Sequence, residues 1–415
     1  MKDAASTSDI EADATAWRSA LRWALVALVL SRLVVWGAGL AALAIWGVHE
    51  PHATGFDPGG LTRPFGQIGN DLVGPGARWD SVWILQIGSG GYEPDPNRAA
   101  FFPLYPGLVA LFGGGVVAGL LVSWACFLGA LTLFHRLAVR EVGAAAAPWA
   151  TMALALFPGA HWFSAVYTES LFLLLSVGAV LAAREDRWLL AGACAALGAA
   201  TRSAGVLLVV PLALLWWDAY RAGLRPPLHG AVAAGAGPLL GLAGVCLTFA
   251  LIGPGWSAPF EAQETWNRTF RGPAAGLWDG TAAAWDGVRQ LIHGRPPPLY
   301  FTEAAGDPLA IARHNVLLWL TLALAVALLI GVWRRLSAAH AAYATAALLL
   351  PLSYPVAPQP LMSMPRFAAV LYPLFLVAGL GLARMPRAAA VSVLAASAGG
   401  LAAVSAIFTC WRWVA

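Results

Sequence analysis

The 415-residue chain is 59% hydrophobic and only 11% charged, and its mean hydropathy is +0.69. Soluble domains carry about 25% charged residues, so this composition excludes an ordinary water-soluble globular protein. The net charge is +4, the sequence has no long basic run, and the four cysteines lie in apolar stretches. A nucleic-acid groove, a disulfide framework and a zinc site are therefore not indicated.

Apolar segments recur along nearly the whole chain, and we predict that eleven of them cross a membrane as helices. The apolar stretch after Arg22 is too long for a signal peptide, so we expect it to remain as the first span. In chain order, the predicted spans are 23–48, 115–135, 146–165, 170–183, 188–201, 204–217, 231–252, 315–333, 338–353, 367–383 and 388–410.

Arginines in the short connections predict the orientation of the chain. Pairs such as Arg136/Arg140 and Arg334/Arg335 fall on one side, which the positive-inside rule makes cytoplasmic. Residues 1–22 are then a cytoplasmic tail and residues 23–415 a single membrane-embedded domain. Two long connections, residues 49–114 and 253–314, become outer loops, and their aromatic content favours ordered, functional loops. We therefore predict an all-α polytopic membrane protein with its N-terminus inside and its functional face outside.

The segments 188–201 and 204–217 are each too short to cross a hydrocarbon core of about 30 Å. A single fused helix would place the arginines that flank it on opposite sides, so a hairpin broken around Arg202 fits the charges better. Irregular backbone at membrane depth persists only where it is buried in protein or lines water. We therefore expect a cavity at this hairpin that opens to the outer face.

In the first outer loop, Asp80 lies between Trp79 and Trp83. Tryptophan is common at the membrane surface, so each indole could be a simple anchor. A carboxylate at the same interface is a candidate general base. The alternative is that Asp80 caps a helix over residues 81–88.

Three further charged residues are candidates for the site. Glu169 opens a predicted helix where little water is available, so we expect it to contact a partner or a substrate; the alternative is compensation of the helix dipole. Arg202 and Arg366 lie at outer helix ends and could bind a phosphate bidentately, or could be snorkelling interfacial arginines. His161 has no partner at metal spacing, so we predict no metal site, and we interpret Arg32 as structural.

Six short strings resemble, in this order, those of the PIG-V family, which is GPI mannosyltransferase 2-like and forms glycosyltransferase family 76. The strings are Arg78-Trp79-Asp80; Gly91-Tyr92 with Phe101-Phe102-Pro103-Leu104-Tyr105-Pro106; Ser164-Ala165-Val166-Tyr167-Thr168-Glu169-Ser170; Ala200-Thr201-Arg202-Ser203-Ala204-Gly205; Gln263-Glu264-Thr265-Trp266-Asn267-Arg268; and Pro365-Arg366-Phe367. The resemblance implies a GT-C fold, a polyprenyl-phosphate-mannose donor and a catalytic acid in the first outer loop. On these strings we predict that Asp80 is catalytic and that the substrate-binding residues are Arg78, Trp79, Tyr92, Tyr167, Glu169, Arg202, Gln263, Trp266 and Arg366.

The predicted reaction moves mannose to a lipid-linked or glycan acceptor in one inverting displacement, with Asp80 as the base. A lipid phosphate is already a good leaving group, so one carboxylate suffices and we predict no metal or cofactor. The predicted partners are membrane lipids, the donor and the acceptor, without nucleic acid. The bias toward alanine, arginine and glycine is typical of GC-rich bacterial coding, so we expect a bacterial plasma membrane.

The alternative function is that of a transporter or flippase for a lipid-linked sugar, which would also need an arginine-lined cavity. Transport sites lie near the bilayer midplane on broken helices, whereas Asp80 lies in a loop outside the predicted spans. A purely structural membrane protein would leave the acids and arginines of the outer face unexplained.

Overall fold

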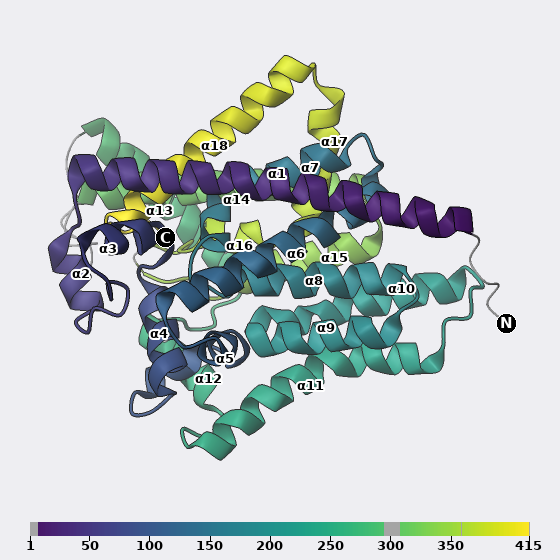
Figure 1. Ribbon diagram of the computed structural model, residues 1–415, viewed down its shortest axis with the longest axis horizontal. Coiled ribbons are helices and arrows are strands. Elements are labelled where there is room, and N and C mark those ends of the chain that lie inside the picture. Colours follow the sequence, from purple (N-terminus) through teal and green to yellow (C-terminus); the bar gives the residue numbers. More distant parts are fainter. Residues whose placement is uncertain (1–6, 294–307, 358, 415) are drawn as a thin grey trace.

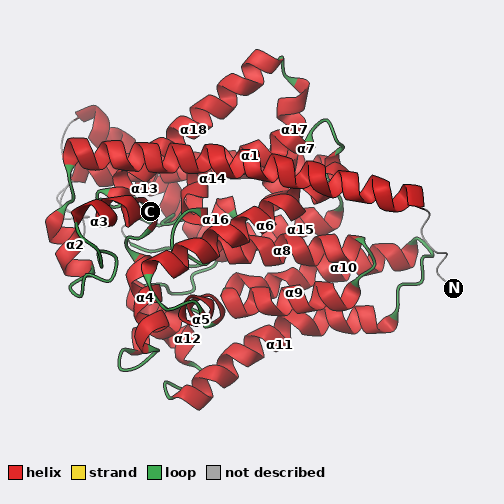
Figure 2. Ribbon diagram, in the orientation of Figure 1, coloured by secondary structure: helices red, strands yellow, loops and turns green. Residues whose placement is uncertain are grey.

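The structure is a computed structural model that describes residues 7–293, 308–357 and 359–414. Within these ranges, the chain forms helices and their connections and contains no strand (Figure 2). Six helical segments of the described residues are long and apolar enough to cross a membrane. The prediction of an all-α polytopic membrane protein is therefore confirmed.

Each of the eleven predicted spans overlaps a helix, although the number that cross the membrane stays a prediction. The long helices are α1 (Thr7–Trp46), α6 (Val116–Val142), α11 (Leu228–Ile252), α14 (Pro308–Arg335) and α18 (Arg387–Thr409). The shorter ones are α7 (Ala147–Leu156), α8 (Glu169–Arg184), α9 (Trp188–Thr201), α10 (Val209–Arg221), α15 (Ala338–Leu352) and α17 (Tyr372–Arg384).

Two predicted spans are not single helices. Over residues 146–165, α7 ends before Pro158 and a 3-10 helix, η3 (Pro158–Phe163), follows, because a proline lacks an N–H and favours extended backbone in the residue before it. Over residues 367–383, the short helix α16 (Met364–Ala369) is separated from α17 by Val370 and Leu371. The prediction of one continuous helix is wrong in both places.

The predicted break after α9 is confirmed. Arg202 is extended, and the chain continues as the 3-10 helix η4 (Ser203–Leu208) before α10. At the turn, a Cβ on Gly205 would lie 2.3 Å from the backbone of Gly198 and Ala199, so only glycine fits without a shift. The turn therefore rests directly on the last turn of α9.

Close packing between α9 and α11 depends on small residues. A Cβ on Gly237 would approach the carbonyl oxygen of Gly192 to 2.5 Å, and one on Gly241 would approach that of Ala196 to 2.0 Å. Small residues at such contacts let helix backbones approach closely, which drives helix association in a membrane, where apolar burial contributes little.

The two predicted outer loops are largely helical over the residues described, and Figure 1 shows their helices at one end of the bundle, near the C-terminus. Residues 294–307 of the second predicted loop lie outside the described residues. The helices of the first loop are α2 (Glu50–Phe56), α3 (Gln67–Val73), η1 (Gly74–Gly76), α4 (Asp80–Gly90), η2 (Pro96–Ala100) and α5 (Leu104–Leu111). Those of the second are α12 (Ala258–Glu261), η5 (Ala262–Trp266) and α13 (Pro273–His293).

Candidate active site

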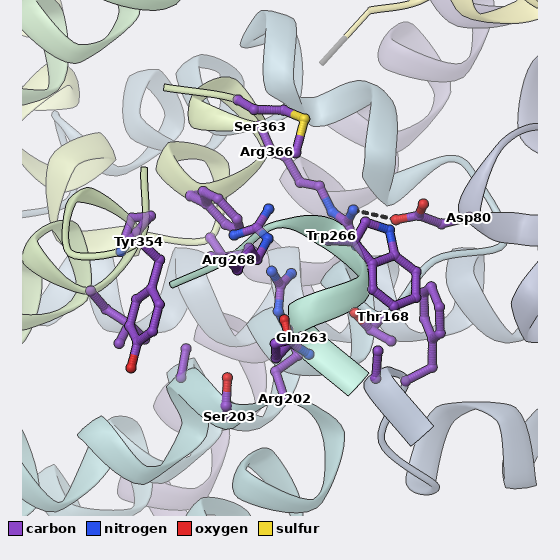
Figure 3. A pocket seen from close by; sticks show the side chains of 18 of the residues that line it. Asp80, Thr168, Arg202, Ser203, Gln263, Trp266, Arg268, Tyr354, Ser363 and Arg366 are labelled. Carbon is purple, nitrogen blue, oxygen red and sulfur yellow. Dashed lines mark hydrogen bonds and ion pairs between the residues drawn. The ribbon is translucent and has the colours of Figure 1, made fainter. Parts of the chain in front are cut away.

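A cavity of about 610 Å³ is lined by residues of both predicted outer loops and by helix ends of the bundle. Charged side chains, among them Asp80, Arg202 and Arg366, lie at the cavity (Figure 3). Apolar side chains also line it, among them Ala347, Leu350 and Val370. Of the predicted site residues, those that line it are Trp79, Asp80, Tyr167, Arg202, Gln263, Trp266 and Arg366. Phe101 and Phe102 of the second string also line it, so the cavity brings together residues from all six strings.

Asp80 is the first residue of α4 and presents its carboxylate to the cavity. Its Oδ2 accepts a hydrogen bond from Nη1 of Arg366 at 2.5 Å, and its backbone N–H donates to the hydroxyl of Tyr167 at 3.2 Å. Oδ1 receives no hydrogen bond from any described residue. The side chain does not cap the helix, so the capping alternative is wrong, and one carboxylate oxygen is available to a ligand.

The backbone conformation of Trp79, the residue before α4, orients the start of this helix and therefore Asp80. The Trp79 backbone has a positive φ of 55° and a ψ of −119°, which is an unfavourable conformation for a bulky residue. Its indole is buried among aromatic rings, with centroid distances of 4.8 Å to Phe56, 5.4 Å to Trp411 and 5.1 Å to Trp413. This cluster joins the first outer loop to the end of the chain and holds the unfavourable turn in place.

Glu169 lies behind the cavity wall and is fully buried at the start of α8. Its Oε1 accepts hydrogen bonds from Nη1 of Arg202 and from Nε of Arg366. A buried carboxylate is costly unless it is paired, and here two guanidinium groups pair with it. Glu169 therefore positions the arginines and does not itself line the cavity.

Arg366 joins the two acids. It donates to both Asp80 and Glu169, and its guanidinium lies 4.8 Å from the centroid of the Tyr167 ring. Although burial lowers the pKa of Arg366, the two carboxylates outweigh this effect and hold the pKa above its ordinary value. The Arg366 side chain is therefore a permanent cation that fixes the position of Asp80.

Arg268 is a cavity residue that the sequence prediction did not select. It follows Asn267, whose left-handed backbone (φ 53°) turns the chain at the end of η5. The guanidinium lies 5.6 Å from the ring centroid of Phe367, and Figure 3 shows it inside the cavity, near Arg202. The string Gln263 to Arg268 contains it, but its position in a long loop gave no pattern that would single it out.

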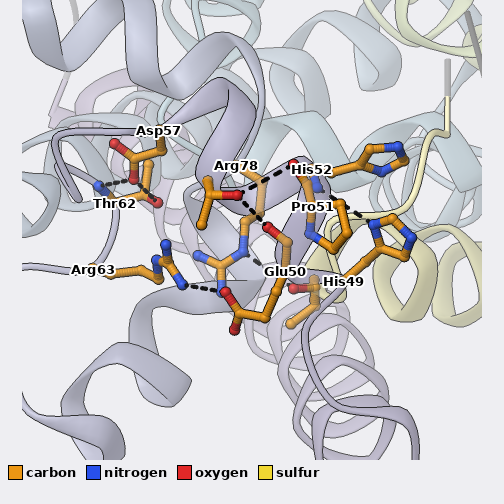
Figure 4. Close-up of polar contacts among 10 residues, drawn as sticks. His49, Glu50, Pro51, His52, Asp57, Thr62, Arg63 and Arg78 are labelled. Carbon is orange, nitrogen blue, oxygen red and sulfur yellow. Dashed lines mark hydrogen bonds and ion pairs between the residues drawn. The ribbon is translucent and has the colours of Figure 1, made fainter.

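Besides Glu169, two predicted site residues do not line the cavity. Arg78 is buried, donates to the backbone oxygens of Thr409 and Ala77 at 3.1 and 2.8 Å, and belongs to the polar contacts of the first outer loop (Figure 4). Tyr92 donates to the carbonyl oxygen of Phe101 at 2.8 Å and does not line the cavity. Both residues make contacts within the protein, and their assignment to substrate binding stays a prediction.

Arg32 and His161 also have structural contacts. Arg32 donates to the carbonyl oxygen of Phe163 at 3.1 Å, in agreement with the structural role expected for it. His161 is buried and shares a hydrogen bond of 3.0 Å with the hydroxyl of Ser405.

Comparison with known proteins gives two matches to the same family. The family model described as mannosyltransferase (PIG-V) matches residues 52–217. GPI alpha-1,6-mannosyltransferase 2 of Rattus norvegicus is 30% identical over 225 residues, which are 49% of this chain and 45% of that protein. The matched stretch thus spans less than half of the relative, and no solved structure matches. The matches confirm the family resemblance: residues 52–217, which contain Asp80, Glu169 and Arg202, match the PIG-V mannosyltransferase family model.

Proposed function

We propose that this protein transfers mannose from a polyprenyl-phosphate-mannose donor to a lipid-linked or glycan acceptor on the non-cytoplasmic face of a membrane. The observation that carries the proposal is the carboxylate of Asp80 at the wall of a cavity that also contains three arginines and an apolar surface. The family match supports mannose as the sugar. The same match supports a GT-C fold.

The chemistry of the site suits a single displacement. One Asp80 oxygen is held by Arg366, while Oδ1 is open to accept the proton of an acceptor hydroxyl. As that hydroxyl oxygen forms a bond to the anomeric carbon, the bond from this carbon to the phosphate oxygen breaks and its electron pair leaves with the lipid phosphate. The configuration at the anomeric carbon is inverted, and the proton of the acceptor hydroxyl ends on Asp80. A positioned base of this kind contributes about 10²–10⁴-fold to a rate.

The same cavity has features that suit both the phosphate and the lipid of the donor. Arginines are suited to the charge that develops on the leaving phosphate, because a guanidinium donates two parallel hydrogen bonds to it. The apolar wall formed by α15 and by residues 370–371 is suited to the first isoprene units of the lipid. The arginines of the short connections, at the opposite helix ends, support an outer-face position for this cavity by the positive-inside rule.

The test is product formation by purified protein in proteoliposomes with radiolabelled polyprenyl-phosphate-mannose and a lipid extract of the native host. Asp80→Asn keeps the size of the side chain but cannot take the proton, so turnover should fall by about 10²-fold or more. Donor affinity and the unfolding temperature should change little. The control is Asp71→Asn, an acid of the same loop that does not line the cavity, and it should retain wild-type turnover.

Two outcomes contradict the proposal. Near-normal turnover in a folded Asp80→Asn variant would remove Asp80 as the base. Movement of labelled lipid-sugar across the vesicle membrane, with no acceptor present and no new glycosidic bond, would instead show a transporter.

A further inference from the structure

The arginines around the cavity differ in how their charge is balanced. Arg202 pairs with Glu169, and Arg366 pairs with both Glu169 and Asp80. Arg268 makes no ion pair and no side-chain hydrogen bond with any described residue, although its guanidinium lies in the same cavity (Figure 3). The cluster of three arginines and two carboxylates therefore carries one excess positive charge, and that charge belongs to Arg268.

Glu264 does not supply the missing negative charge. It also lines the cavity, but its side chain is exposed and forms no ion pair among the described residues. The excess charge is therefore not balanced by an ion pair with any described residue.

The surroundings make this charge costly. Burial is the main cause that lowers the pKa of Arg268 to about 10, and the neighbouring Arg366 lowers it further. The group is still protonated at neutral pH, but its charged form lacks both full hydration and a carboxylate partner. A ligand that brings one negative charge would restore the balance, because a charge-assisted hydrogen bond is strongest in a partly desolvated site.

We infer that Arg268 is the residue that binds the phosphate of the lipid-linked donor, because the charges of Arg202 and Arg366 are already balanced by Glu169 and Asp80. A sugar on a polyprenyl phosphate carries one negative charge, which equals the excess of the cluster. The apolar wall favours a phosphate attached to a lipid over free phosphate. The identity of the ligand rests on the proposed function, whereas the assignment of Arg268 rests on the geometry of the ion pairs.

Binding of a phosphate-bearing lipid to detergent-solubilised protein tests the inference without any acceptor or turnover. Ligand-induced thermal stabilisation is measured with undecaprenyl phosphate, with undecaprenol, which lacks the phosphate, and with inorganic phosphate, which lacks the lipid. The variants are Arg268→Gln, which removes the charge, and Arg268→Lys, which keeps the charge but loses the planar fork. The control is Arg271→Gln, a nearby arginine that pairs with Asp279 outside the cavity.

Wild-type protein should bind undecaprenyl phosphate more tightly than either partial ligand. Arg268→Gln should weaken this binding by about 10- to 100-fold, as expected for the loss of a charge-assisted hydrogen bond, and should leave the weak binding of undecaprenol unchanged. Arg268→Lys should fall between the two, and Arg271→Gln should match the wild type. If Arg268→Gln does not fold, Arg268→Lys decides, since wild-type affinity in that variant excludes the bidentate contact.

Wild-type affinity for undecaprenyl phosphate in a folded Arg268→Gln variant would overturn the inference, even if mannose transfer is observed. Equal binding of inorganic phosphate and undecaprenyl phosphate by the wild type would overturn the assignment to a lipid. Conversely, loss of binding in Arg268→Gln together with an absence of any mannose transfer would support the phosphate site and reject the proposed function. Failure of the Arg268 inference and failure of the proposed mannose transfer are therefore distinguishable.

Discussion

One carboxylate oxygen of Glu169 accepts hydrogen bonds from two arginines, and this arrangement decides how the charges at the cavity wall are shared. Because Arg366 also reaches Asp80, the base and the buried acid are linked through a single guanidinium. The two acids therefore differ in role. Asp80 has an oxygen open to the cavity, whereas Glu169 is fully buried behind it.

Glu169→Gln should reveal this difference. The amide keeps the size but removes the negative charge, which leaves Arg202 and Arg366 without their shared partner. Breaking a buried ion pair costs about 3–5 kcal/mol, so the unfolding temperature should fall clearly, while turnover per folded molecule should fall less than in Asp80→Asn. Thermal unfolding and turnover are measured together. Glu50→Gln, at an exposed pair with Arg63, is the control and should change neither.

An unchanged unfolding temperature combined with a loss of turnover as large as that of Asp80→Asn would give Glu169 a chemical role. In that case the division between a base and a positioning acid would not hold.

At the scale of helices, most of the architecture could be predicted from hydropathy and charge. The break at Arg202 is predictable because a turn between two short segments fits their flanking arginines better than one fused helix does. The breaks at Pro158 and after Ala369 were not predicted, because hydropathy does not distinguish a continuous α-helix from an apolar stretch that leaves the helix. These irregular segments contribute to the site, since Trp162 and Arg366 belong to them.

The hairpin turn at Gly205 should be intolerant of any side chain. Gly205→Ala would place a Cβ against the backbone of α9, and overpacking of this kind costs about 1–3 kcal/mol. We expect a lower unfolding temperature and, because Arg202 lies three residues before the turn, weaker binding of the donor. Gly235→Ala is the matched control, since nothing lies within 4 Å of its added Cβ. Equal stability of the two variants would show that the backbone adjusts without cost.

The pairing of residues across the chain could not be predicted from the sequence. Asp80 and Arg366 are separated by 286 residues, and no local pattern indicates that they meet. The same limit explains why Arg268 was overlooked while Arg78 and Tyr92 were selected. All three lie in strings that resemble the family, but only the folded chain shows which side chain faces the cavity.

The orientation of the whole molecule can be tested by labelling with a membrane-impermeant maleimide, after the native cysteines are replaced. Cysteines at Pro96 and Arg289, which are exposed in the two predicted outer loops, should be labelled in intact cells. A cysteine at Leu224, which is 75% exposed in the connection from α10 to α11, should be labelled only after the cells are permeabilised. Labelling of Leu224→Cys in intact cells would reverse the orientation and place the cavity on the cytoplasmic side.

The contact between the first outer loop and the end of α18 also fixes the order in which the site can form during synthesis. Arg78 donates to the carbonyl oxygen of Thr409, which is 331 residues further along the chain, and Trp79 packs on Trp411 and Trp413. At about 5–20 residues per second, the ribosome needs roughly 15–70 s to make this stretch. Throughout that time the turn at Trp79 lacks two of the rings that hold it, those of Trp411 and Trp413. We therefore expect newly inserted protein to lack this support for Asp80 until its last helix has docked, and a chain that terminates before Thr409 to lack it altogether.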